Sequence, residues 1–336
     1  MKSIVKKEIR EWTMKYPSAP ELDCTAPCSM YRVFLEHHLI PDLFLGITEQ
    51  KLRRMSDSGC TFEAVFSVDE QILHRRYIDL LFEGLDTLCT IYLNEQKLDR
   101  VQNMHRSYRY EVKQLLLSGR NVIRLEFQSP TRYFERMHER HELYSNDGCT
   151  IPGAAHLRKA FFMSGWDWAP TLPDMGIWKP VQLIAYDSDC ILDFDTRQIH
   201  RDGTADVTVS AEIRHPSGLP VYVSMDGQTA AIKNGAARFH FAHPRLWWVR
   251  GYGPQPLYDV RVWVEDPVSH EVLSEKRKKI GLRTLTVSTK PDPDGKGREF
   301  CFVNNGVRIF SMGANYVPQD SLLTRVGHAE LDRMMQ

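Results

Sequence analysis

The stretch NVIRLEF, residues 121–127, carries the pattern that decides the fold. In it the apolar side chains of Ile123, Leu125 and Phe127 alternate with two charged ones. A period of two places one face of a segment against a core and the other in water, which is typical of a half-buried β-strand. The same alternation recurs from about Phe62 onward. The sequence therefore predicts a mainly β protein.

Neighbouring segments extend this prediction. Leu88–Leu98 is expected to form two short strands around a polar turn at Asn94-Glu95, and Ala205–Ile213 alternates again. Helical periodicity is limited to three stretches, at about Ser29–His38, Glu49–Met55 and His328–Met335. Strands are thus expected to dominate, in antiparallel sheets.

Composition excludes several classes of function. The 43 Lys and Arg residues balance the 43 Asp and Glu residues, so no net field draws the chain to nucleic acid or to an anionic membrane. With 42% apolar residues the chain has enough material for a sizeable core. Neither nucleic acid nor membrane is expected as a partner, and a homodimer is left open.

The cysteines and the N-terminus bear on the compartment. The seven cysteines are odd in number and scattered, which favours reduced thiols over a disulfide framework, and Cys24 and Cys28 form the only close pair. The first residues lack the unbroken apolar run of an export signal. We expect a cytoplasmic protein.

Sequence signals for a metal or a cofactor are weak. His138 and His141 are three residues apart, whereas a zinc-protease helix needs histidines four apart around the glutamate. Neither a dinucleotide fingerprint nor a phosphate loop is present in the sequence. We therefore expect no cofactor and no metal.

Two changes in composition mark the predicted domain boundaries. An acidic stretch with Asp187, Asp189, Asp193 and Asp195 precedes a fresh set of strands, and a polar, turn-rich segment follows at Lys290–Arg298. The segment between them has the size of a β-sandwich. A final piece of about fifty residues contains a hairpin signal and one helix, which is too little to bury its own core, so the chain is expected to continue.

The densest cluster of unusual residues is RKAFFMSGWDWAPTLPDMGIWKP, residues 158–180. Within it Asp167 lies between Trp166 and Trp168. A carboxylate flanked by indole rings suits a sugar, because the ring faces cover C–H surface while the carboxylate accepts hydroxyl hydrogens. The alternative places both tryptophans in the core, on one face of a strand, with Asp167 as their solvated neighbour. The pattern alone favours this alternative.

The same run belongs to a series of segments that resembles the N-terminal part of the β-mannosidases of glycoside hydrolase family 2. The segments occur in family order: LIPDLFLG (39–46), DLLFEGLDTLCTIYLN (79–94), NMHRSYRYEV (103–112), RKAFFMSGWDWAPTLPDMGIWKPV (158–181), RLWWVRGYGPQPLYDV (245–260), KIGLRT (279–284) and NNGVRIFSMGANYVPQDS (304–321). The Gly-Trp-Asp-Trp-x-Pro run is characteristic of the mannosidase-like branch.

The resemblance implies a fold and a division into domains. Residues 1–186 are expected to form a jelly-roll, galactose-binding-like β-sandwich and residues 187–284 an immunoglobulin-like β-sandwich. Residues 285–336 are expected to begin a (β/α)8 barrel that is truncated after its first strand. In such barrels the chemistry lies on loops at the C-terminal ends of the strands.

The resemblance also implies an activity, the exo-acting, retaining hydrolysis of terminal non-reducing β-D-mannose from β-mannosides. Its two glutamates lie on later barrel strands in the family, so this chain alone is expected to be inactive and no catalytic residue is assigned in it. The one Asn-Glu dipeptide, Asn94-Glu95, falls in a predicted hairpin turn and is rejected as catalytic. Other family 2 exo-glycosidases, such as a β-glucosaminidase or a β-galactosidase, and a non-catalytic carbohydrate-binding module remain as alternatives.

What carries over to this chain is contact with the sugar. In related enzymes a loop of the first domain reaches over the barrel mouth, and its acid binds hydroxyls of the terminal sugar. The matching residue is Asp167, with Trp166 and Trp168 beside it, and the resemblance makes sugar binding the favoured interpretation. Arg158 is a weaker candidate. Tyr316 stands where the family usually has tryptophan, so its hydroxyl leaves the exact sugar open.

Overall fold

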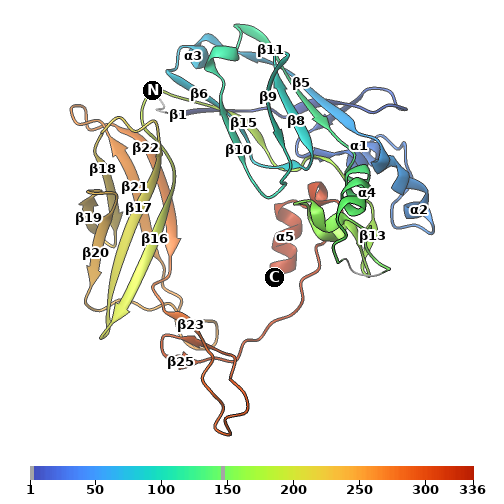
Figure 1. Cartoon of the computed structure of the whole chain (residues 1–336). Coiled ribbons are helices and arrows are strands. Elements are labelled where there is room, and N and C mark those ends of the chain that lie inside the picture. The colour runs from blue at the N-terminus through green and yellow to red at the C-terminus, as the bar shows by residue number, and fades with distance from the viewer. Residues whose placement is uncertain (1–3, 145–147) are drawn as a thin grey trace. The chain divides into compact units, whose positions relative to one another are not determined.

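Strand β11 (Gly119–Phe127) forms at the predicted place, with Ile123, Leu125 and Phe127 buried as the alternation requires. The computed structural model describes residues 4–144 and 148–336, and the fold is mainly β (Figure 1). The chain divides into two units, one of Val5–Ala185 with Val317–Gln336, the other of Tyr186–Tyr316 with Ile4.

The first unit is a β-sandwich of the jelly-roll, galactose-binding-like kind. Its six-stranded sheet has the order β3 (Leu22–Thr25), β2 (Glu11–Lys15), β5 (Cys60–Val68), β11, β8 (Cys89–Leu93), β9 (Gln96–Val101). Its four-stranded sheet has the order β1 (Ile4–Glu8), β15 (Val181–Tyr186), β6 (Tyr77–Phe82), β10 (Tyr108–Glu111). Inward side chains from both sheets, such as Phe62 and Phe82, share one hydrophobic core. A small sheet, β4 (Cys28–Ser29), β14 (Gly176–Ile177) and β7 (Leu85–Asp86), extends the sandwich.

Helices of the first unit partly match the prediction. The two predicted near its N-terminus form as α1 (Met30–Glu36) and as α2 (Thr48–Leu52) with the 3-10 turn η1 (Arg53–Asp57). Short pieces not predicted are α3 (Glu70–Leu73), η2 (Lys113–Leu115), η3 (Ala154–His156) and η4 (Phe161–Met163). No helix within residues 4–144 and 148–336 is both long and apolar enough to cross a bilayer.

Helix α4 (Pro130–Arg140) corrects the prediction that helical periodicity is limited to three stretches. Its start follows from local chemistry, because Ser129 accepts a hydrogen bond from the backbone N–H of Arg132 and Pro130 occupies the first turn. Only Pro130, Thr131 and Phe134 of the helix are buried. So narrow an apolar face explains why periodicity alone did not reveal it.

The second unit is an immunoglobulin-like sandwich of two antiparallel sheets. One has the order β16 (Cys190–Arg201), β17 (Thr204–Arg214), β20 (Ala237–Phe241). The other has the order β19 (Gln228–Ala231), β18 (Val221–Met225), β21 (Tyr258–Glu265), β22 (Val272–Ile280). Val207 and Val209, expected inward from their alternation, are buried in a core shared with Val260 and Val262 of the opposite sheet.

A three-stranded antiparallel sheet follows, with β23 (Leu285–Ser288), β24 (Cys301–Asn304) and β25 (Val307–Arg308). The predicted hairpin forms, and Asn305 and Gly306 take the positive φ angles, 48° and 81°, that a tight two-residue turn requires. Residues 309–318 form no strand. A parallel barrel strand is stabilised by neighbours that follow it through crossover connections, and this segment has no such neighbour among the described residues.

The C-terminal segment then contacts the first unit. Leu322 is 1% exposed and packs in the jelly-roll core. The hydroxyls of Ser29 and Thr324 are 2.9 Å apart, and the Arg32 guanidinium donates to the Thr324 carbonyl. The 3-10 turn η5 (Leu323–Arg325) and helix α5 (His328–Met335) complete the segment, the helix at the predicted place.

Candidate functional site: an exposed aromatic hairpin

The cluster around Asp167 folds as a two-stranded hairpin. Strand β12 (Ser164–Trp166) pairs with β13 (Ala169–Thr171), with Trp166 opposite Ala169. Asp167 and Trp168 form the two-residue turn between the strands. The acid therefore lies at the tip of the hairpin rather than in the middle of one strand.

A neighbouring segment holds the hairpin in place. The backbone N–H of Ile151 donates to the Ser164 carbonyl at 2.9 Å, and the hydroxyl of Thr150 donates to the Gly165 carbonyl at 3.0 Å. Gly165 has a φ of 110°, and a Cβ there would lie 2.0 Å from the carbonyl oxygen of Cys149. Only glycine fits this close approach of two backbones.

Four aromatic rings gather at the hairpin. The Trp166 ring packs against Phe161 at a centroid distance of 6.0 Å, Trp168 packs against Phe162 at 5.5 Å, and the two indoles lie 6.2 Å apart. Trp166 is 37% exposed and Trp168 42%. The alternative that places these tryptophans in the core is therefore wrong, because Trp166 ends a strand at a surface turn and Trp168 lies in that turn.

Asp167 is exposed, as that alternative expected, yet its surroundings differ from those of a solvated strand residue. Within residues 4–144 and 148–336 its carboxylate has no hydrogen-bond or ion-pair partner. Both oxygens are therefore available to accept hydroxyl hydrogens, next to two partly exposed indoles. Ring faces beside a carboxylate match the C–H faces and hydroxyl groups of a pyranose.

A buried polar network lies at the base of the same run. Lys159, 6% exposed, pairs with the buried carboxylate of Asp86, and its Nζ donates to the Asp174 carbonyl at 2.7 Å. The Asp174 carboxylate accepts from the backbone N–H groups of Tyr31 (3.1 Å) and Met175 (2.9 Å). Burial raises the pKa of Asp174 to about 6, against the opposing effects of its hydrogen bonds and of the Lys159 charge.

Trp178 fixes the end of the run. Its indole N–H donates to the Met104 carbonyl at 2.8 Å, and a Cβ at Gly84 would lie 2.4 Å from the same indole nitrogen. Gly176 is equally constrained, because a Cβ there would lie 2.5 Å from the Cys28 carbonyl oxygen. Segments 79–94, 103–112 and 158–181, which carry the family resemblance, therefore pack against one another.

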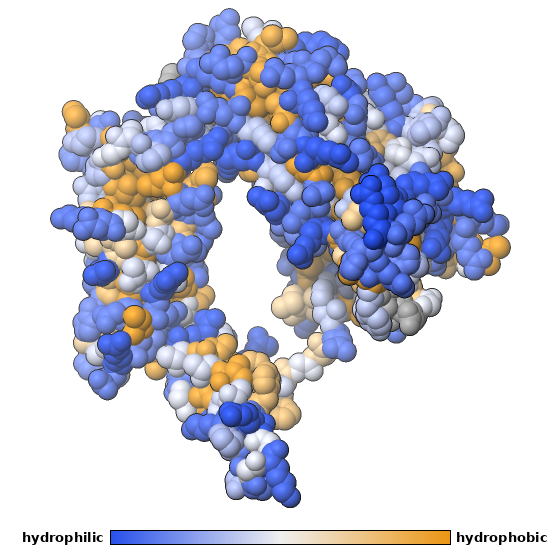
Figure 2. Space-filling view, viewed as in Figure 1, coloured by the Kyte–Doolittle hydropathy of each residue, from blue (hydrophilic) through white to orange (hydrophobic). Residues whose placement is uncertain are grey.

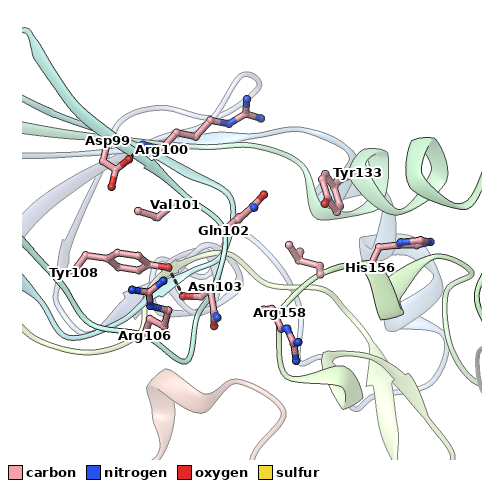
Figure 3. A pocket seen from close by; sticks show the side chains of 11 residues that line it. Asp99, Arg100, Val101, Gln102, Asn103, Arg106, Tyr108, Tyr133, His156 and Arg158 are labelled. Atoms are coloured by element: carbon pink, nitrogen blue, oxygen red, sulfur yellow. Dashed lines mark hydrogen bonds between the residues drawn. The ribbon is translucent and has the colours of Figure 1, made fainter. Parts of the chain in front are cut away.

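The remaining predicted residues lie elsewhere. Arg158 lines a polar cavity of about 380 Å³ on the first unit, and none of the residues lining that cavity comes from the hairpin (Figure 3). Tyr316 is 55% exposed and belongs to the second unit. Of the predicted set, the structure brings together Trp166, Asp167 and Trp168. Sequence reasoning missed Phe161 and Phe162, although both stand in the quoted run.

Glu95 lies in the β8–β9 turn and pairs with Arg124 at 3.0 Å, and its positive φ of 65° fits that turn. Over residues 4–144 and 148–336, no group of three or more His, Cys, Asp or Glu side chains is arranged to hold a metal ion.

Comparisons with known proteins concern the family and the fold of the chain. A model of the glycosyl hydrolase 2 galactose-binding domain-like family matches residues 12–179, and one of glycosyl hydrolases family 2 matches residues 180–283. Among curated proteins, β-mannosidase B of Emericella nidulans is 31% identical over 90% of this chain and 37% of its own length. The β-mannosidase of Capra hircus is 26% identical over 94% and 39%.

Solved structures with a similar fold include another β-mannosidase. The β-D-mannosidase from Dictyoglomus thermophilum superposes with a TM-score of 0.89 at 27% identity, over 98% of this chain and 42% of that one. A β-glucuronidase from Ruminococcus gnavus, at 16% identity and a TM-score of 0.61, shares the fold. The chain spans only 35 to 39% of the length of these curated β-mannosidases.

Proposed function

The chain belongs to glycosyl hydrolases family 2, and on that premise we propose that it supplies the sugar-recognition and scaffold domains of an exo-acting, retaining β-mannosidase. The substrate would be a β-mannoside with a terminal non-reducing β-D-mannose. Similarity to proteins named β-mannosidase over most of this chain supports the proposal.

The observation that carries the proposal is the exposed Trp166-Asp167-Trp168 turn. Its carboxylate is without a partner among the described residues, and the indoles beside it are 37% and 42% exposed. An anionic acceptor that binds two sugar hydroxyls forms charge-assisted hydrogen bonds, which are stronger than neutral ones. We assign Asp167 to hydroxyls of the terminal mannose and the indole faces to its C–H surface.

The chemistry itself is assigned to residues outside this chain. Retaining glycosidases use two carboxyl groups about 5 to 5.5 Å apart, one as acid/base and one as nucleophile in a covalent glycosyl intermediate. We propose that both glutamates belong to later barrel strands, beyond residue 336, and that this chain alone is inactive. The share of 37% that it spans in a relative supports this division. The chain's own part is to bind and orient the terminal sugar.

A panel of aryl glycosides tests the substrate. We expect a longer protein that contains this chain and a whole barrel to hydrolyse p-nitrophenyl β-D-mannoside faster than the β-D-galactoside or the β-D-N-acetylglucosaminide. Tyr316, in place of the family's usual tryptophan, is the residue to vary if another sugar is preferred. A faster rate on either of the other two glycosides would assign the protein to a neighbouring exo-glycosidase, and binding of mannosides without turnover would indicate a binding module.

We further infer a cytoplasmic location. No disulfide joins any of the seven cysteines, although the Sγ atoms of Cys24 and Cys28 lie only 3.6 Å apart. Fractionation of cells that produce the tagged protein tests this, and recovery from the medium would contradict it. A homodimer is left open, and light scattering on the purified protein measures the assembly directly.

A further inference from the structure

The polar cavity that Arg158 lines has features of a second binding site. It lies on the first unit between the loop after β9, strand β10 and the end of the 3-10 turn η3 (Figure 3). Its volume of about 380 Å³ is that of a small-ligand pocket. The mannose site proposed above does not use it.

The walls of this cavity are held by backbone contacts. Asn103 and Arg158 form a parallel β-bridge, and the Met104 N–H donates to the Arg158 carbonyl at 3.0 Å. The Tyr108 hydroxyl donates to the Asn103 carbonyl at 2.8 Å. These contacts join two segments that are far apart in sequence, so the cavity is largely formed before any ligand binds.

The charges around the cavity are unbalanced. Arg106 and Arg158 lie on either side of Asn103 in Figure 3, and within the part of the chain that the structure describes neither guanidinium pairs with a carboxylate. Arg106 lies over the Tyr108 ring at 5.9 Å. Asp99, the acid in the lining, already accepts from the Tyr110 hydroxyl at 2.7 Å. Arg100, the third arginine of the lining, already donates to the side-chain oxygen of Gln128 at 2.9 Å. The guanidiniums of Arg106 and Arg158 are therefore the ones that offer donors to an anion.

We propose that this cavity binds a uronic acid residue of an acidic glycan. The guanidiniums of Arg106 and Arg158 bind the carboxylate, which suits their fork-like donor geometry. The amides of Gln102 and Asn103 and the ring of Tyr133 supply hydroxyl partners and an apolar face. The two sites together would let the protein hold a glycan that carries both a neutral and an acidic sugar.

Ligand-observed NMR titration of the 336-residue chain with methyl β-D-glucuronide tests the proposal. We expect saturable binding that weakens as salt is added, and a loss of roughly tenfold in affinity for Arg106→Gln. Arg132→Gln is the matched control, because this exposed arginine pairs with Glu135 and does not line the cavity, and it should leave the affinity unchanged. Methyl β-D-glucoside, which lacks the carboxylate, should not bind.

Other results would overturn the proposal. If methyl β-D-glucoside bound with the same affinity as the glucuronide, the two arginines would not recognise a carboxylate. If inorganic phosphate bound as tightly as the glucuronide, the cavity would be a general anion site. No binding of any of these probes would also overturn it. The Asp167→Ala variant should keep its glucuronide affinity, so that failure of the mannose proposal and failure of this one are distinguishable.

Discussion

At the scale of single residues, Asp167 differs from an ordinary surface acid in its surroundings. Its carboxylate is exposed and flanked by two indoles, and its backbone is held by a hairpin that depends on Gly165. The backbone that carries the carboxylate is therefore ordered before any ligand binds, which lowers the entropic cost of the sugar binding that we propose.

Replacing Asp167 by alanine tests its role in a protein that contains this chain and a whole barrel. We expect kcat/KM for an aryl β-mannoside to fall roughly thirtyfold, about 2 kcal/mol, since a charged hydrogen-bond acceptor is lost in the transition state. Asp195→Ala, which removes an exposed acid of the second unit, should have no effect. An unchanged kcat/KM for Asp167→Ala would exclude this residue from the sugar site.

Asp174 provides a prediction of pH dependence. Burial raises its pKa to about 6, so between about pH 4 and pH 6 the folded chain holds a proton that the unfolded chain has lost. This residue's contribution to stability therefore falls as the pH rises through that window. An asparagine can accept the same two backbone hydrogen bonds without a charge to bury.

Urea unfolding of wild type and Asp174→Asn at several pH values measures this effect. Relative to wild type, the free energy of unfolding of the variant should rise between pH 4 and pH 7 by up to about 3 kcal/mol. Groups common to both proteins cancel in this difference. A difference that stays constant over the range would show that Asp174 is ionised throughout.

At the scale of elements, the hairpin β12–β13 is too short to be stable alone. Strands of three residues are marginal without tertiary support, and here the support comes from residues 149–151. The fit at Gly165 is therefore a condition for the position of Asp167.

Two glycine variants separate steric fit from backbone strain. Gly165→Ala and Gly119→Ala both place a side chain at positive φ, 110° and 85°, but only the first meets a neighbouring atom, at 2.0 Å. We expect Gly119→Ala to cost about 1 kcal/mol and Gly165→Ala clearly more, with altered tryptophan fluorescence. Equal costs would mean that the contact with Cys149 does not constrain the hairpin.

The C-terminal segment should stabilise the jelly roll. Leu322 is 1% exposed in that core, so Leu322→Ala is expected to lower the free energy of unfolding by about 2–5 kcal/mol. Leu331→Ala, at a position 39% exposed in α5, should cost much less. Similar costs in thermal or urea unfolding would show that the segment does not pack there in solution.

The elements differ in how far the sequence predicts them. Alternation identified β11 and β17 because one face of each is buried, and Asn305-Gly306 identified its hairpin because few residues adopt positive φ. Trp166-Asp167-Trp168 resembled a strand, since nothing local marks its turn and the hairpin is held by contacts with residues 149–151. Helix α4 did have a readable signal, the Ser129-Pro130 start.

At the scale of the whole molecule, the sequence predicted the mainly β architecture. It did not predict the buried polar network of Lys159, Asp86 and Asp174. Asp86 and Lys159 are 73 residues apart and pair only because the jelly roll brings their segments together. No local pattern distinguishes such a lysine from a solvated one. The domain boundaries expected at residues 186 and 284, and the sugar-binding role of the candidate residues, stay predictions.

The first experiment should test whether the catalytic glutamates lie outside this chain. Hydrolysis of p-nitrophenyl β-D-mannoside should be followed for the 336-residue chain and for a longer protein that continues through a whole barrel. We expect no turnover by the chain alone and clear turnover by the longer protein, because the two glutamates are assigned beyond residue 336. Turnover by the chain alone, or none by the longer protein, would contradict this assignment.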